Sequence, residues 1–199
     1  MTIYHGDSLQ VSSCLHAKLR IRQRSVYINR YPPTIVRSMK ARVLDVCCGS
    51  RMFWFDPADE RAVFLDKRSE SLEVSDSSNK TGKRKIIVAP DILADFKSLP
   101  FPDSSFSLVV FDPPHLVRCG KKSWLAAKYG KLPGDWRWEL SEGFKEAFRV
   151  LKPDGVLIFK WNEREIPVSQ VLELTPEKPL FGNRSTNKAT HWITFIKSS

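Results

Sequence analysis

The sequence predicts an α/β protein built on a mostly parallel sheet. From Ala41 onward, short and continuously apolar runs alternate with polar or helical stretches, which is typical of strands that are buried on both faces. Four of these runs end in or are followed by an aspartate, namely Asp45, Asp66, Asp91 and Asp112. Because ligands of open parallel sheets bind beyond the carboxyl ends of the strands, the four carboxylates predict a site at that edge.

The expected strands are short, and helical patterns separate the later ones. The strands cover residues 42–48, 62–66, 85–89, 106–112, 156–161 and 191–196. Residues 67–85 are polar and charged, which predicts a loop or an exposed helix. Apolar residues at helical spacing predict an amphipathic helix over 140–151, which the Lys-Pro-Asp-Gly sequence at 152–155 ends. A short helix is expected within 166–174.

Composition places the chain among ordinary globular proteins. It is 42% hydrophobic and 27% charged, which argues against a disordered, collagen-like or coiled-coil chain. No apolar run approaches the roughly 18 residues that a membrane span needs, and the first residues lack the apolar segment of a signal peptide. The four cysteines include no Cys-x-x-Cys pair, which argues against a disulfide framework and a zinc site. We therefore expect a reduced, cytoplasmic protein without a metal.

The net charge of +10 is concentrated near the N-terminus. Residues 1–42 hold eight Lys and Arg residues and one acidic residue. We expect a basic N-terminal arm or cap over residues 1–40, which a solvated basic leader would explain equally well, and one globular domain over 41–199. A basic balance favours a polyanionic partner.

Three segments resemble class I S-adenosylmethionine (SAM)-dependent methyltransferases. The sequence Leu-Asp-Val-Cys-Cys-Gly-Ser at 44–50 resembles the first motif of that family. Residues 99–110 resemble its segment leading into the fourth strand, and residues 144–159 resemble its helix-to-fifth-strand segment. The likeness covers about 41–197. It implies a SAM-dependent enzyme with a Rossmann-like fold, a mostly parallel central sheet, an antiparallel last strand and helices on both faces.

The cofactor-binding residues follow from the first half of this resemblance. The turn after the first strand must let the backbone approach the ligand, which favours a glycine, and Gly49 stands there. The resemblance implies that Asp66 accepts hydrogen bonds from the ribose hydroxyls and that Asp91 and Ile92 contact the adenine. Each aspartate could instead cap a helix. The expected cofactor-binding residues are Asp45, Cys47, Gly49, Asp66, Lys67, Asp91, Ile92 and Asp112.

The sequence Asp112-Pro113-Pro114-His115 resembles the Asp/Asn-Pro-Pro-aromatic motif of methyltransferases that act on planar amines: adenine N6, cytosine N4 or a glutamine amide. The resemblance implies that these four residues are catalytic. The Asp112 carboxylate and the Pro113 carbonyl would accept the two N–H groups of the amine and stabilise the charge that grows on nitrogen. The prolines fix φ, and His115 stands where the family has an aromatic residue that stacks on the target ring. A rigid turn after a strand is the alternative.

The segment that follows this motif mixes basic and aromatic residues. Residues 115–138 hold six Lys and Arg residues, one acidic residue and four Trp or Tyr residues. Basic side chains contact phosphates, aromatic rings stack on unstacked bases, and a target base in a duplex would have to flip out. A solvated loop with core tryptophans is the alternative. The expected substrate contacts are Arg118, Lys121, Lys122, Trp124 and Tyr129.

Together these patterns predict a methyltransferase that modifies the exocyclic amine of a nucleic-acid base, in RNA or DNA, with adenine N6 ahead of cytosine N4. No separate recognition domain fits between Asp45 and Asp112 or after Lys160, so we expect a short or loose sequence context, or a partner subunit. Two alternatives stay open. One is methylation of a protein amide or a small molecule. The other is an inactive subunit that binds SAM or nucleic acid, which His115 and the glycine-poor first motif allow.

Overall fold

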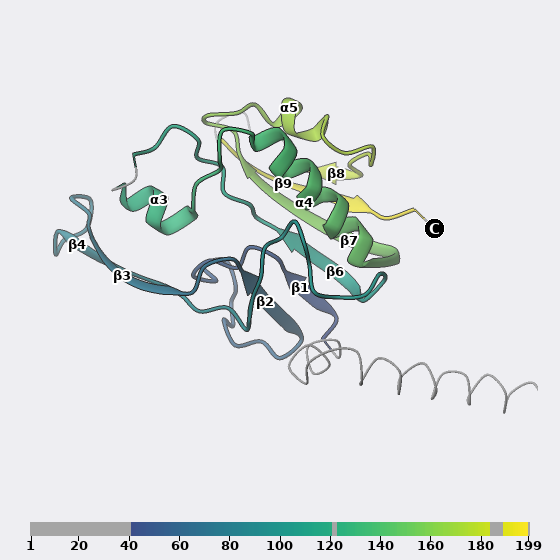
Figure 1. Cartoon of the computed structure of the whole chain (residues 1–199), viewed down its shortest axis with the longest axis horizontal. Coiled ribbons are helices and arrows are strands. Elements are labelled where there is room, and N and C mark those ends of the chain that lie inside the picture. Colours follow the sequence, from purple (N-terminus) through teal and green to yellow (C-terminus); the bar gives the residue numbers. More distant parts are fainter. Residues whose placement is uncertain (1–40, 121–122, 184–188, 199) are drawn as a thin grey trace, which may run out of the picture. The chain divides into compact units, whose positions relative to one another are not determined.

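The computed structural model describes residues 41–120, 123–183 and 189–198 (Figure 1). The expected basic arm at 1–40 therefore lies outside the described residues, as do the expected substrate contacts Lys121 and Lys122. Among the helices of the described part, none is long and apolar enough to cross a membrane.

The described residues form a mostly parallel sheet, as predicted. Its strand β1 lies between β2 and β6, parallel to both, and β7 continues the sheet parallel to β6. The last long strand, β9, runs antiparallel to β7, which confirms the expected antiparallel strand of a Rossmann-like fold. In spatial order the strands are β5 (Ile92–Leu93), β2 (Ala62–Asp66), β1 (Val43–Asp45), β6 (Phe106–Phe111), β7 (Leu151–Asn162), β9 (Thr190–Ile196) and β8 (Phe181–Gly182).

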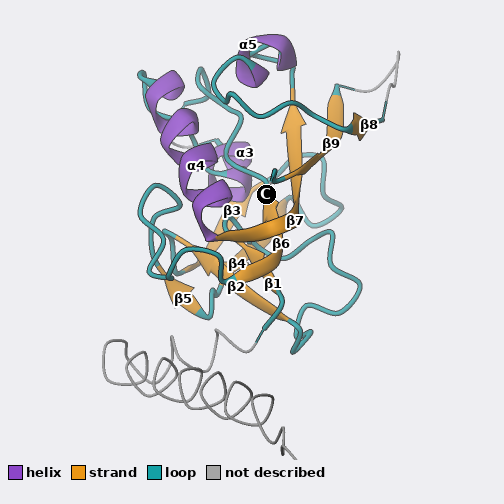
Figure 2. Cartoon of the chain, turned by 90° about the vertical axis from the view of Figure 1, so that its right-hand side faces the viewer, coloured by secondary structure: helices purple, strands orange, loops and turns teal. Residues whose placement is uncertain are grey.

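One face of the sheet is covered by a long helix. The described helices are α3 (Trp124–Tyr129), α4 (Trp136–Val150) and α5 (Val168–Leu172). Helix α4 begins after Asp135, whose side chain accepts the N–H of Trp138, and it runs along one side of the sheet (Figure 2). The ring of Phe144 packs 5.4 Å from that of Phe111 and 4.9 Å from that of Phe159. The expected amphipathic helix is therefore confirmed, and it forms one half of the core.

An irregular crossover packs against the opposite face of the sheet, where the described residues form no helix. The crossover 46–61 joins β1 to β2 without a helix, and it contains positive φ angles at Gly49 and Arg51 that a right-handed helix does not tolerate. The ring of Trp54 lies edge-on to Phe64 at 4.8 Å, and the Arg51 guanidinium lies 3.8 Å from the centre of the same Phe64 ring. Aromatic and cation–π contacts hold this layer in place.

Residues 67–85 lie mostly in an antiparallel hairpin, which corrects the predicted loop or exposed helix. Strand β3 (Glu70–Ser75) pairs with β4 (Lys83–Val88) in a separate two-stranded sheet, and the hairpin extends beside α3 (Figure 1). Within the two strands, Ile86 and Val88 are the buried residues, at alternate positions on one side. Because most hairpin positions are polar, the sequence shows little of this alternation. The expected third strand therefore lies outside the central sheet, and β5 takes its place at the edge.

Asp45 at the end of β1 is fully buried beneath the crossover and holds it to the sheet. Its carboxylate accepts the indole N–H of Trp54 at 2.8 Å and the backbone N–H of Cys47 at 3.2 Å. Both donors are neutral, so no cation offsets the loss of hydration. Burial accordingly raises the pKa of Asp45 to about 7.

We expect Asp45→Asn to remove a pH dependence of stability. The folded-state pKa of Asp45 lies above its unfolded value, so its contribution is fully present below about pH 4 and is lost as pH rises through about 7. Across this window the free energy of unfolding of the unmodified protein should fall, relative to the variant, by up to about 1.4 kcal/mol per pH unit. Urea unfolding at a series of pH values measures both slopes. Parallel curves would contradict the prediction, because they would show that Asp45 does not titrate in this range, and a constant offset between them would report the altered hydrogen bonds to Trp54 and Cys47.

Candidate active site

A cleft of about 530 Å³, open to solvent on one side, lies at the carboxyl ends of the central strands. This position agrees with the rule for ligand sites in open parallel sheets. The lining comes from the turn after β1, the end of β2, the segment after β5, the loop after β6 and helix α3. The lining residues are Val46, Cys47, Cys48, Gly49, Ser50, Met52, Phe53, Asp66, Lys67, Arg68, Phe96, Asp112, Pro114, Lys128 and Tyr129.

The turn after β1 presents bare backbone to the cleft. Gly49 has a φ of +50°, which L residues rarely adopt, and a Cβ atom placed there would meet no other atom within 4 Å. Its N–H donates to the carboxylate of Asp66 at 2.9 Å, which joins the turn to the end of β2. Cys47 also lines the cleft, and burial raises the pKa of its thiol well above the ordinary value, so it is not a reactive thiolate. Cys47 and Gly49, two of the expected cofactor-binding residues, therefore both line the cleft.

Asp66 is the buried carboxylate at the centre of this arrangement. It is 5% exposed, and besides Gly49 it accepts the backbone N–H of Arg68 at 2.9 Å. The guanidinium of Arg68 donates a hydrogen bond to the carbonyl of Ala127 at 2.9 Å and so links α3 to the end of β2. Lys67 lines the cleft beside them, as expected. Oδ1 of Asp66 also accepts the Arg68 Nε–H at 3.4 Å, whereas Oδ2 accepts the N–H of Gly49 and has a further lone pair for a hydrogen bond from a ligand.

Two expected cofactor contacts, Asp91 and Ile92, do not line the cleft. Asp91 precedes β5, so it lies at the amino end of that strand, where its carboxylate binds Arg51 at 2.9 Å and the N–H of Phe64 at 3.0 Å. The error follows from the misassigned third strand. The residue that follows β5 into the cleft is Phe96, and Asp95 beside it is the acidic residue at the carboxyl end.

Asp45 is likewise not part of the lining. Its role is structural, because it supports the turn from below through Trp54 and Cys47. Of the four aspartates that the sequence singles out, the cleft lining therefore contains Asp66 and Asp112.

The Asp-Pro-Pro-His segment directly follows β6. Asp112 and Pro114 line the cleft, and Pro113 is buried. A fifth of the Asp112 side chain (20%) is exposed, and its carboxylate forms an ion pair with the ammonium of Lys160. Burial raises the pKa of Asp112, and Lys160 opposes that effect. Asp112 thus presents a partly desolvated acceptor to the cleft.

His115 packs among aromatic rings beside the cleft. Its ring centre lies 5.3 Å from that of Tyr129 and 6.4 Å from that of Trp161. Burial, together with the charge of Lys160, lowers the pKa of His115 to about 4. The imidazole is therefore neutral at pH 7, so it can serve as an uncharged planar surface.

Sequence reasoning missed Lys160, Phe53 and the position of Trp192. Lys160 Nζ lies 5.3 Å from the centre of the Phe53 ring and 5.6 Å from that of Trp192. Trp192 is 37% exposed. One signal was present: Lys160 is the one charged residue in the otherwise apolar run 156–161.

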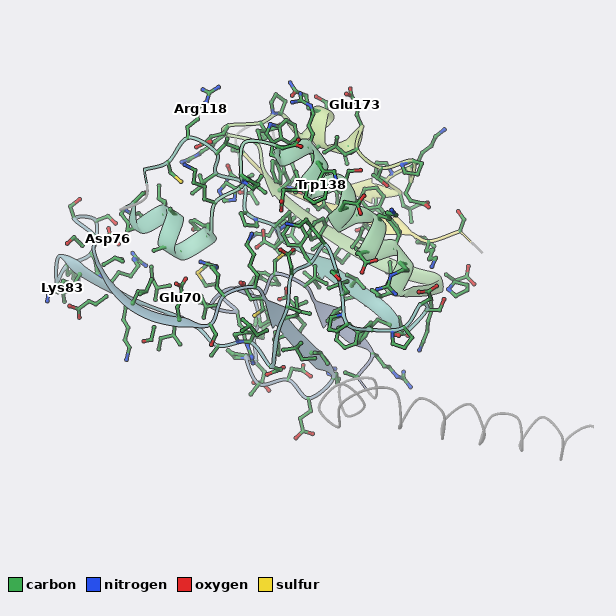
Figure 3. All side chains as sticks on the ribbon, viewed as in Figure 1. Glu70, Asp76, Lys83, Arg118, Trp138 and Glu173 are labelled. Carbon is green, nitrogen blue, oxygen red and sulfur yellow. The ribbon has the colours of Figure 1, made fainter. Side chains whose placement is uncertain are left out.

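The expected substrate contacts divide into two groups. Tyr129 lines the cleft together with its neighbour Lys128. Trp124 is the first residue of α3 and does not line the cleft; the guanidinium of Arg84 lies 5.1 Å from its ring centre. Arg118 is exposed and points away from the body of the protein (Figure 3), while its backbone N–H donates to Glu165 at 2.9 Å.

Comparison with known proteins finds likeness in structure alone. No protein family model and no curated protein sequence matches the chain. Among solved structures, a protein from Pyrococcus horikoshii is 18% identical with a TM-score of 0.47, covering 92% of this chain and 91% of its own. A SAM-dependent methyltransferase from Leishmania major is 14% identical with a TM-score of 0.46, covering 88% of this chain and 70% of its own.

A third solved structure is the 1,6-didemethyltoxoflavin-N1-methyltransferase of Burkholderia thailandensis, with bound 1,6-didemethyltoxoflavin and S-adenosylhomocysteine. It is 11% identical with a TM-score of 0.46, covering 100% of this chain and 94% of its own. At such identities and TM-scores, these likenesses do not assign a cofactor or a substrate to this chain.

Proposed function

We propose that this protein is a SAM-dependent methyltransferase that transfers a methyl group to the exocyclic amine of a nucleic-acid base, with adenine N6 ahead of cytosine N4. One observation carries the proposal. The carboxylate of Asp112, at the start of the Asp-Pro-Pro-His segment, lines the same cleft as the Gly49 turn and Asp66. A hydrogen-bond acceptor for an amine and a binding surface for a nucleoside therefore lie in the same cleft.

The residues on the cofactor side fit SAM. Gly49 leaves open space where any other residue would place a side chain, so a ligand can lie against the backbone. The remaining lone pair on Oδ2 of Asp66 suits a ribose hydroxyl, and Phe96 offers an apolar face at the end of β5. When bound, SAM supplies a methyl group on a sulfonium sulfur, and the C–S bond breaks as the new C–N bond forms.

The residues on the acceptor side act on the amine. An exocyclic amine is a poor nucleophile because its lone pair is delocalised into the ring. The Asp112 carboxylate and the Pro113 carbonyl accept its two N–H groups, which directs the lone pair away from the ring and stabilises the charge that develops on nitrogen. After the transfer, the positively charged amine loses one proton to the solvent, to which the cleft is open. The remaining contribution is alignment of the reacting atoms.

The surroundings favour a nucleic-acid base over a protein amide. His115 is neutral at pH 7 and lies against Tyr129, so the two rings offer planar surfaces next to Asp112. Three cations, Lys67, Arg68 and Lys128, share the cleft lining and suit a phosphate backbone. A protein amide would use neither the cations nor the rings. RNA and DNA both carry this chemistry, so the assay below tests each.

We expect Gly49→Ala to weaken SAM binding at least tenfold, because its methyl group would occupy the space of the ligand. Gly82→Ala is a matched control: Gly82 also has a positive φ, of +67°, and also has open space within 4 Å of the position that a Cβ atom would take, but it lies in the hairpin. Both variants should lose about 1 kcal/mol of stability from backbone strain. Isothermal titration calorimetry with SAM measures the affinity. Equal affinities in the two variants would exclude the Gly49 turn from the cofactor site.

We expect Asp112→Ala to reduce methyl transfer by about a hundredfold or more, because an acceptor for the amine is lost. Asp103→Ala is the control, since Asp103 precedes β6 at the opposite edge of the sheet and its side chain is 78% exposed. Methyl-labelled SAM is incubated with tRNA, rRNA, duplex DNA, single-stranded DNA and protein, and the products are digested and identified as nucleosides by mass spectrometry.

Label in N6-methyladenosine or N4-methylcytidine, or in their deoxy forms, supports the proposal if Asp112→Ala abolishes it and Asp103→Ala does not. Label found in protein or a small molecule alone contradicts the nucleic-acid substrate. Tight SAM binding without label in any substrate contradicts catalysis by the isolated chain and favours a binding subunit.

A further inference from the structure

Three adjacent strands place Asp112, Lys160 and Trp192 in one row. Phe111 of β6 pairs with Phe159 of β7, so the next residues, Asp112 and Lys160, are neighbours across the two chain segments. Lys160 in turn pairs with Trp192 of β9. Phe111 and Phe159 point toward α4, where their rings pack against Phe144. Because side chains alternate between the two faces of a sheet, the row of Asp112, Lys160 and Trp192 lies on the opposite face.

The ammonium of Lys160 is held from three sides. It contacts the carboxylate of Asp112, and the rings of Phe53 and Trp192 flank it. These two rings also pack edge-to-face, with centres 5.4 Å apart. The Lys160 side chain is 20% exposed, so the charge is largely removed from water. An ion pair in such surroundings is strong, and removing one partner is costly.

The remaining charged and titratable groups near Asp112 do not replace Lys160. Asp45 of β1 is acidic, burial keeps the Cys47 thiol in the turn neutral by raising its pKa, and His115 in its own loop is neutral at pH 7. Asp66, Lys67, Arg68 and Lys128 share the cleft lining. Within the described part of the chain, Lys160 is the cation that forms an ion pair with Asp112.

We propose that Lys160 is a positioning residue that keeps the Asp112 carboxylate ionised and oriented, so that one oxygen stays free to accept the N–H of the target amine. The inference rests on the function proposed above. A protonated Asp112 would present a donor where the amine needs an acceptor. Lys160 binds the oxygen Oδ2, which leaves Oδ1 for the substrate, and the rings of Phe53 and Trp192 restrict the lysine to that position.

Three substitutions of Lys160 separate charge from hydrogen bonding. Lys160→Met removes both, Lys160→Gln keeps a donor without a charge, and Lys160→Arg keeps both. Lys97→Met is the matched control, since Lys97 is equally exposed at 20%, pairs with Glu139 and lies 5.4 Å from the ring centre of Trp138. Circular dichroism and SAM affinity establish which variants are folded.

The first readout is the titration of Asp112, followed by the carbon-13 signal of its carboxyl group and assigned with Asp112→Asn. We expect the midpoint to move to higher pH in Lys160→Met and Lys160→Gln, because burial then acts without an opposing cation. It should stay in place in Lys160→Arg and Lys97→Met. The second readout is the pH dependence of kcat with the acceptor identified above. Its acidic limb should move in the same direction. At pH 7, kcat should fall about tenfold to a hundredfold with little change in KM, and the loss of kcat should increase from Lys160→Arg through Lys160→Gln to Lys160→Met.

The outcomes distinguish this inference from the proposed function. If the unmodified protein methylates no acceptor, the proposed function fails, while the carbon-13 titration still reports whether Lys160 controls Asp112. If the protein is active but Lys160→Gln leaves both the Asp112 titration and the acidic limb unchanged, the inference is overturned and the function stands. A rise in KM alone would assign Lys160 to substrate binding and would overturn the positioning role as well.

Discussion

The parallel pairing of β1 with both β2 and β6 determines where the polar groups of the cleft lie. Leu44 pairs with Val63 on one side and Val109 on the other, so the three strands finish at one edge in register. The chain must then turn across that edge after each strand. Gly49, Asp66 and Asp112 lie at or after these strand ends and reach the same space for this reason, although Gly49 and Asp112 are 63 positions apart in the sequence. The apolar residues within the strands are buried in the core, and polar residues at the strand ends line the cleft.

Two carboxylates on one face of this sheet illustrate how differently burial can be offset. Asp45 is satisfied by the neutral donors Trp54 and Cys47, and its pKa rises to about 7. Asp112 faces the cation Lys160, which opposes the same effect of burial. Pairs of groups whose surroundings treat their charges differently are a feature of sites that handle protons. Here the difference agrees with a supporting role for Asp45 beneath the turn and with the proposed role of Asp112 as hydrogen-bond acceptor.

The sequence alone was enough to propose those residues of the candidate site that lie next to a buried apolar run. The Gly49 turn, Asp66 and Asp112 each follow a buried run directly, so reading one strand at a time was enough to find them. Asp91 was misplaced because a run of the β3–β4 hairpin is as apolar as a short core strand, and only pairing shows which sheet it joins. Lys160 was missed because its importance depends on the register of three strands, which no single run contains.

The β3–β4 hairpin has a structural consequence for the acceptor side of the cleft. Arg84 of β4 lies over the ring of Trp124 in α3, and Arg68, just before β3, donates to the carbonyl of Ala127 in the same helix. Helix α3 has no buried residue of its own, so packing against a core does not fix it. These two arginines therefore anchor it, and with it Lys128 and Tyr129 of the lining. A six-residue helix is too short to be stable alone, so the hairpin is what gives the loop after β6 a defined surface beside Asp112.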